Sequence, residues 1–208
     1  MAQNKSSAVM QQRREPHDSL DDYPTPCWAT RALIEGLYPT PPVWPLSVRE
    51  PCANRGHMVR PLAEYFATVD AADIFDYGAG FPVRDYLFGP MPDAVDWTVM
   101  NPPFRLAEQF IQRALQSSRK GVVVIVRTAF LESVGRYNSL FSHVAPSQVL
   151  QFSERVVMHK GRLSEKGSTA TAYCGLIWHQ GRNGCEFNWI APCRKRLERA
   201  GDYPSETR

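Results

Sequence analysis

A chain of 208 residues, 43% of them hydrophobic and 22% charged, fits one globular domain with a substantial core and leaves little room for a second. No apolar run reaches the roughly 18 to 20 residues of a membrane helix, and the first residues lack the apolar core of a signal peptide, so we expect a cytoplasmic protein without membrane contact. The five cysteines are scattered without a C-x-x-C pair, which disfavours both a disulfide framework and a zinc site.

The net charge of +3 conceals an uneven distribution along the chain. Residues 1–104 contain 8 Lys and Arg against 13 Asp and Glu, whereas residues 105–208 contain 16 against 8. An acidic half suits a cationic ligand, and a basic half suits a phosphate backbone. A solvated basic face explains the same charges, so both interpretations stay open on charge alone.

The chain divides into three parts by composition. Residues 1–20 are polar and without periodicity, which predicts a flexible amino-terminal arm. Residues 21–200 carry the periodic segments of a single domain, and residues 201–208 form a short carboxyl-terminal tail.

A helix is predicted directly after the arm. Thr25 is placed to cap it, Pro26 occupies the first helical position, and Gly36 lies near its end. The backbone N–H groups at such a helix start have no partners within the helix and are available to a ligand. A plain capped helix explains the same residues.

The next segment reads as a strand, a turn of small residues and a helix. Ser47 to Glu50 is the strand, residues 51–56 are the turn, and residues 57–67 are predicted to be helical. Glu50 at the strand end suits a positively charged ammonium group, whereas a phosphate-binding loop would avoid a carboxylate there.

Two more acidic residues follow in order. Residues 68–74 are a predicted strand, and Asp73 lies near its end, where a βαβ fold holds ribose hydroxyls. Asp85 is placed to accept a hydrogen bond from an adenine amino group, with Tyr86 flanking the ring. Each acid alone is equally explained as a solvated or capping residue, and their ordered series is what favours a site.

Residues 96–100 form a predicted strand that ends at Asn101-Pro102-Pro103-Phe104. The prolines restrict the backbone, so the Asn101 side-chain oxygen and the Pro102 carbonyl become two fixed acceptors for an NH2 group. Phe104 adds a flat apolar face for a planar base. An ordinary strand-to-helix turn is the alternative.

The second half continues the alternation of helices and strands. We predict a helix over residues 105–118, a buried strand over 121–126, a mainly helical segment over 128–144, and strands over 148–157, 171–178 and 187–190. Residues 194–196 read as a solvated basic tail. Lys160, Arg162 and Lys166, in the polar loop 158–169, are the candidate contacts to a nucleic-acid backbone, with a solvated hairpin as the alternative.

The ordered pieces between residues 23 and 104 resemble the class I S-adenosylmethionine-dependent methyltransferases, specifically the amino-group (N6-adenine) DNA methyltransferases with an Asn/Asp-Pro-Pro-Tyr/Phe motif. The resemblance implies an α/β fold: a single Rossmann-like class I methyltransferase domain with a mostly parallel central sheet and helices on both faces. It implies catalytic roles for Asn101, Pro102, Pro103 and Phe104. It also implies S-adenosyl-L-methionine as the cofactor, held by Tyr23, Thr25, Pro26, Glu50, Cys52, Gly56, Asp73, Ile74, Asp85, Tyr86 and Asn101.

The implied reaction is methyl transfer to N6 of adenine in DNA by direct displacement on a flipped base, without a metal. The expected partner is double-stranded DNA, read by loops or by a second subunit of a homodimer, and restriction-modification is one role. The corner formed by Asn101, Pro102 and Pro103 also suits N4 of cytosine, an RNA adenine or a glutamine amide. A non-catalytic nucleic-acid-binding module is the alternative from another class, because Asn54 stands where the family's turn commonly has Gly.

Overall fold

The computed structural model describes residues 20–38 and 45–203, so nearly all of the expected arm and the last residues of the expected tail lie outside the described ranges. Within them the centre of the molecule is a seven-stranded sheet in the order β2-β1-β3-β4-β6-β5-β7. The strands are β1 Ser47–Glu50, β2 Thr68–Ala71, β3 Val95–Met100, β4 Ser118–Arg127, β5 Gln148–Phe152, β6 Tyr173–His179 and β7 Glu186–Ile190.

The sheet is mostly parallel, as predicted. Strands β2, β1, β3 and β4 run parallel to one another, β6 is antiparallel to both β4 and β5, and β7 is parallel to β5. Because β1, β3 and β4 are parallel neighbours, the loops that follow them emerge at the same edge of the sheet. That edge is where open α/β sheets bind ligands.

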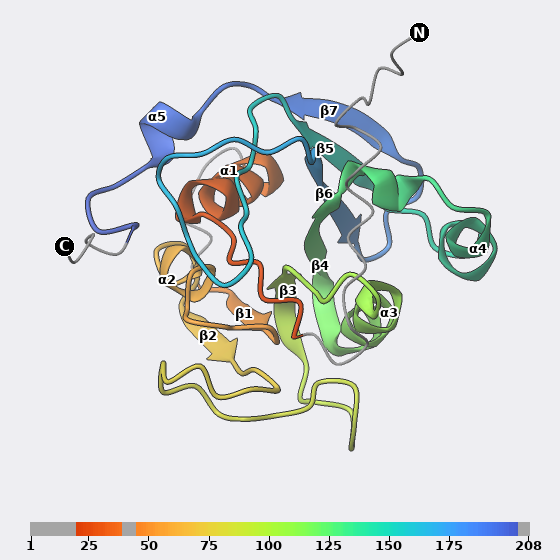
Figure 1. The fold of residues 1–208 in the computed structure, drawn as a ribbon. Helices are drawn as coiled ribbons and strands as arrows, with labels where there is room; N and C mark the ends of the chain where they lie inside the picture. The colour runs from red at the N-terminus through yellow and green to blue at the C-terminus, as the bar shows by residue number, and fades with distance from the viewer. Residues whose placement is uncertain (1–19, 39–44, 204–208) are drawn as a thin grey trace, which may run out of the picture.

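Helices cover both faces of the sheet, which confirms the predicted fold class (Figure 1). One face carries α1 and α2, and the other carries α3. The helical elements are α1 Cys27–Leu37, α2 Val59–Leu62, α3 Ala107–Ser117, η2 Thr128–Leu131, α4 Val134–Arg136, η3 Tyr137–Phe141 and α5 Arg194–Leu197. Within the described ranges, none of them is long and apolar enough to cross a membrane.

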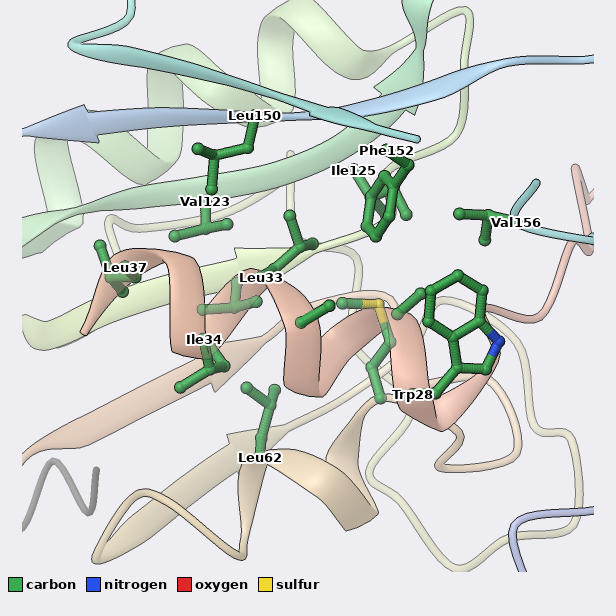
Figure 2. Close-up of a cluster of buried hydrophobic side chains, with 14 of the residues drawn as sticks. Trp28, Leu33, Ile34, Leu37, Leu62, Val123, Ile125, Leu150, Phe152 and Val156 are labelled. Carbon is green, nitrogen blue, oxygen red and sulfur yellow. The ribbon is translucent and has the colours of Figure 1, made fainter. Parts of the chain in front are cut away.

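Strand β4 contributes to two cores because its side chains alternate between the faces. Val123 and Ile125 pack with Trp28 and Leu33 of α1, and Figure 2 shows α1 lying across this cluster. The intervening valines face the other way, toward Ile111 of α3. The helix predicted over residues 105–118 and the buried strand predicted over 121–126 are therefore confirmed.

Three predicted elements are shorter in the structure. The helix expected over residues 57–67 is regular only over Val59–Leu62, and Pro61, which lacks a backbone N–H, lies within it. The strand expected over 68–74 ends at Ala71, after which Asp73 forms a single bridge with Val83. The strand expected over 148–157 ends at Phe152.

The basic segment at residues 194–196 is not a solvated tail, so that prediction is wrong. It forms α5, which contacts α1, and Arg196 pairs with Glu35 at 2.6 Å. Farther along, Asp202 accepts hydrogen bonds from both terminal nitrogens of Arg31, at 2.7 and 2.9 Å, and Arg31 is only 2% exposed. The packed chain therefore extends past the boundary expected at residue 200.

Candidate active site

A cavity at the carboxyl ends of β1 and β3 brings together most of the predicted site residues. Its wall includes Tyr23, Thr25, Cys52, Asp73, Ile74, Asp85, Tyr86, Asn101 and Pro103. The remaining predicted members do not line it: Pro26, Glu50, Gly56, Pro102 and Phe104 lie behind or beside the wall, and Lys160, Arg162 and Lys166 lie on a separate loop. Predicted site residues that are far apart in the sequence therefore share one cavity, and the other predicted residues lie outside its wall.

The turn after β1 lines the cavity from Pro51 to Asn54. Asn54 has a left-handed backbone conformation, with φ at 49°, which is the requirement that Gly meets most easily. Asn meets it at low cost and adds a link, because its Nδ2 donates to Oδ1 of Asp22 at 2.7 Å. Its backbone N–H donates to Oδ2 of Asp73 at 2.8 Å. Asn54 therefore fits this turn.

We expect Asn54→Val to lower the free energy of unfolding by about 2 kcal/mol, because a β-branched residue at positive φ is strained. Asn54→Gly is the matched control, since it keeps the backbone conformation and loses only the side-chain hydrogen bonds with Asp22 and Arg55, and it should stay within about 1 kcal/mol of wild type. Urea denaturation measures both. Equal stability of the two variants would contradict a steric demand at this position.

Glu50 is fully buried beneath the turn rather than exposed on the cavity wall. Its Oε1 accepts a hydrogen bond from the backbone N–H of Cys52 at 2.8 Å, and its Oε2 has no partner among the described residues. Burial raises the pKa of this carboxyl well above its usual range, the Cys52 N–H lowers it in part, and the charge of Asp73 raises it. Because Cys52 lines the cavity, this buried oxygen without a described partner lies behind the cavity wall.

Asp73 and Asp85 both reach the cavity, but they are held differently. Both oxygens of Asp73 accept backbone N–H groups, from Asn54 and, at 3.1 Å, from Phe75, while burial raises the pKa of the carboxyl. Asp85 is exposed, and its Oδ1 accepts the N–H of Leu87 at 2.9 Å. The capping interpretation thus holds for one oxygen of Asp85, and its Oδ2 has no partner in the described ranges.

An aromatic and an aliphatic side chain, each adjacent in sequence to one of these acids, also line the cavity. Tyr86 is buried, its ring packs against Phe110 with centroids 5.3 Å apart, and its hydroxyl lies 3.4 Å from Oγ of Ser117. Ile74 is 58% exposed and borders the same space. Acidic acceptors that share a cavity with an aromatic ring and an aliphatic side chain are suited to a nucleoside.

The orientation of the Asn101 amide is fixed by its partners. Its Nδ2 donates to the carbonyl of Tyr23 at 2.9 Å and to Oγ1 of Thr25 at 3.0 Å. Because a carbonyl only accepts, the atom facing Tyr23 must be the nitrogen. Oδ1 is then left as an acceptor, and within the described ranges no group donates to it. Thr25 was predicted to cap α1, which is wrong: Pro26 precedes the helix without a side-chain cap, and the Thr25 hydroxyl holds Asn101 instead.

The two prolines after Asn101 differ in their carbonyls. The Pro103 carbonyl accepts the N–H of Leu106 at 2.9 Å, at the start of the turn into α3. The Pro102 carbonyl receives no hydrogen bond from any described residue. Oδ1 of Asn101 and O of Pro102 are thus two acceptors at adjacent positions that receive no hydrogen bond from the described residues.

Phe104 is placed next to this corner but not on the cavity wall. Its backbone N–H donates to Oδ2 of Asp21 at 2.6 Å. Its ring lies 5.9 Å from the ring of Tyr23, and the guanidinium carbon of Arg127 lies 4.0 Å from its centroid. One partner of this ring is therefore a cation.

The loop predicted to contact nucleic acid lies against the same corner (Figure 1). Gly161 donates its N–H to the carbonyl of Asp22 at 2.8 Å, and Sδ of Met158 lies 3.8 Å from Nδ2 of Asn101. The side chains of Lys160, Arg162 and Lys166 are exposed. The loop therefore presents positive charge beside the cavity rather than inside it.

Comparison with protein-family models finds no match, and neither does comparison with curated proteins. Among solved structures, the chain is similar to a candidate class I S-adenosylmethionine-dependent methyltransferase from Listeria monocytogenes, with a TM-score of 0.60 and 11% identity over 82% of this chain and 66% of that one. The type I restriction-modification methyltransferase subunit from Streptococcus thermophilus also has a TM-score of 0.60, at 10% identity over 88% and 50%. A candidate RNA methyltransferase from Pyrococcus horikoshii has a TM-score of 0.54, at 16% identity over 82% and 94%.

This chain has the fold of the class I S-adenosylmethionine-dependent methyltransferases. It spans 66% and 50% of the length of the first two relatives, so it corresponds to part of each of them.

The fold also brings residues to the cavity that the sequence interpretation missed, among them Asp21, His57, Met58, Tyr77 and Leu106. Burial, with the charges of Arg60 and Arg55, lowers the pKa of His57 to about 4, so the ring is neutral at neutral pH. The available signal for His57 and Met58 was their position directly after the turn, where the start of the following segment faces the same ligand.

Proposed function

We propose that this chain is an S-adenosylmethionine-dependent methyltransferase that modifies the exocyclic N6 of adenine in DNA. The observation that carries the proposal is the amide of Asn101, whose nitrogen is held by Tyr23 and Thr25 so that its oxygen is left as an acceptor at the cavity. The fold supports S-adenosylmethionine as the cofactor, and the available oxygen of Asn101 supports an amino group as the group that receives the methyl.

The residues around the cavity suit S-adenosylmethionine. The turn from Pro51 to Asn54 would hold the methionine part, with the orphaned Glu50 oxygen as the partner of its ammonium group. Asp73 would accept the ribose hydroxyls, and Asp85 with Tyr86 would bind the adenine. When bound, the cofactor supplies a methyl group on a sulfonium sulfur.

The acceptors at the corner would prepare the target nitrogen. The lone pair of an aromatic amine is delocalised into its ring, so the nitrogen is a weak nucleophile. Oδ1 of Asn101 and the Pro102 carbonyl would each accept one N–H, which favours a pyramidal nitrogen with its lone pair directed at the methyl carbon. A new N–C bond would form as the C–S bond broke, and one amino proton would pass to solvent. Phe104 remains a predicted contact of the flipped base.

DNA is favoured over other substrates that carry an amino group. The exposed basic side chains of the loop 158–169 lie beside the corner, and one structural relative is a restriction-modification methyltransferase subunit. The alternatives remain N4 of cytosine and RNA adenine, the second because another relative is a candidate RNA methyltransferase. Double-stranded DNA is the proposed partner.

The test is incubation of the protein with isotopically labelled S-adenosylmethionine and unmethylated duplex DNA, single-stranded DNA or RNA, followed by digestion and nucleoside analysis. We expect labelled N6-methyladenine from duplex DNA. Label in N4-methylcytosine or in RNA would replace the proposed substrate. Cofactor binding by calorimetry without transfer to any nucleic acid would favour a non-catalytic binding module.

A further inference from the structure

Arg127, the last residue of β4, is an arginine whose charge has no partner within the described ranges. Its guanidinium carbon lies 4.0 Å from the ring centroid of Phe104 and 6.0 Å from that of Tyr23. Its Nε is buried and without a hydrogen bond, and no carboxylate in those ranges pairs with it. A planar cation is thus held on an aromatic ring beside the methyl-transfer corner.

A second arginine in the same chain gives the contrast. Arg136 also stacks on a phenylalanine, with its guanidinium carbon 4.3 Å from the centroid of Phe130, but it donates a hydrogen bond to the Phe130 carbonyl. Stacking on a ring contributes only about 0.5 to 2 kcal/mol and satisfies none of the five N–H donors. The terminal N–H groups of Arg127, which are not buried and have no partner in the described ranges, are therefore available to an acceptor from outside the protein.

The position of Arg127 indicates what that acceptor is. Thr128 donates its N–H to the carbonyl of Ala172 at 2.9 Å, so Arg127 lies where the loop carrying Lys160, Arg162 and Lys166 rejoins the sheet at β6. The ring against which the Arg127 guanidinium stacks is that of Phe104, directly after Pro103. A strand that delivers a base to this corner must bring its phosphates past the same place.

We propose that Arg127 binds a backbone phosphate of the target strand beside the methyl-transfer site. The ring of Phe104 fixes the plane of the guanidinium, so that its terminal N–H groups can donate hydrogen bonds to that phosphate. The guanidinium matches a phosphate through two parallel hydrogen bonds, and fixing its plane beforehand reduces the entropy lost on binding. The inference rests on the proposed function for the identity of the strand. It also gives Phe104 a second task, which is to position Arg127.

The test compares Arg127→Gln with wild type for binding to a mixed-sequence 30-base-pair DNA duplex, measured by fluorescence anisotropy from low to moderate salt. Glutamine keeps a planar group on the ring and removes the charge. We expect about 10-fold weaker binding at low salt, and a log–log salt slope that is shallower by about 1, the contribution of one phosphate. The dissociation constant for S-adenosylmethionine should not change, because Arg127 does not line the cofactor cavity.

Two further variants separate this role from a structural one. Arg127→Lys keeps the charge, so it should restore the salt slope while binding less tightly than wild type. Arg182→Ala removes an equal charge at the opposite end of β4, in the turn after β6, and should leave binding and slope nearly unchanged. Thermal denaturation checks that each variant is folded.

The outcomes distinguish this inference from the proposed function. A wild-type salt slope in Arg127→Gln would overturn the role of Arg127, even if the wild type methylates DNA. A slope shallower by about 1 in Arg127→Gln, together with no methyl transfer by wild type, would support the role of Arg127 and refute the proposed activity. No DNA binding by wild type at low salt would overturn the inference itself.

Discussion

We expect Asn101→Ala to reduce methyl transfer by about 1,000-fold, because the variant lacks the side-chain acceptor that holds the target amino group in its reactive geometry. Single-turnover assays with labelled cofactor measure the effect on the chemical step. Binding of S-adenosylmethionine should change by less than about threefold, since Asn101 is one member of a wall formed by many residues. The loss should therefore appear in the rate and not in the affinity.

Asn101→Asp is the informative companion to Asn101→Ala. Aspartate restores an acceptor and occurs at this position in the resembling family, but it removes the amide nitrogen that donates to Tyr23 and Thr25. Placing a carboxylate against the Tyr23 carbonyl is unfavourable, so we expect this variant to be slow as well, by about 10- to 100-fold. Full activity of Asn101→Asp would contradict the claim that these two partners orient the side chain.

The layered fold follows from the sequence because its strongest signals are local. The run of valines before Arg127 has no polar residue to place on a surface, which indicates a strand covered on both faces, and the structure confirms it. The strand β3 and the helix α3 have similarly regular patterns. The position of β7, which is parallel to β5 at the edge of the sheet, depends on long-range pairing that no local pattern specifies.

The sequence predicts the position of a residue that follows a strand of the parallel sheet, because the strand order brings it to the cavity. It does not predict the partner of a side chain when that partner is distant in the sequence. Asp73 and Asn101 reach the cavity because the carboxyl ends of neighbouring parallel strands meet there. Thr25 has the local signature of a helix cap, but its hydroxyl is used by Asn101, which is 76 residues away in the chain. The contact between Arg127 and Phe104 likewise joins the end of β4 to the turn after β3 and has no sequence signature.

Glu50→Gln is expected to weaken the binding of S-adenosylmethionine by about 100-fold, because it removes the carboxylate that would pair with the ammonium group. The same change should stabilise the ligand-free protein above mildly acidic pH. Burial raises the pKa of Glu50 in the folded state above its unfolded value, so the folded protein keeps a proton that the unfolded chain has lost. Stability then falls as pH rises from the unfolded pKa to the folded one, and glutamine lacks this dependence.

Two measurements test both parts of the Glu50 prediction. Denaturation of the ligand-free proteins should give equal stabilities near pH 4 and an increasing advantage of Glu50→Gln toward pH 8, a difference that a purely structural Glu50 without a shifted pKa would not produce. Calorimetry in buffers of different ionisation enthalpy should detect proton release when wild type binds the cofactor, since the ammonium charge favours the ionised carboxylate. If Glu50→Gln releases the same number of protons as wild type, the carboxylate does not meet the cofactor, and the cation partner must be sought elsewhere on the cavity wall.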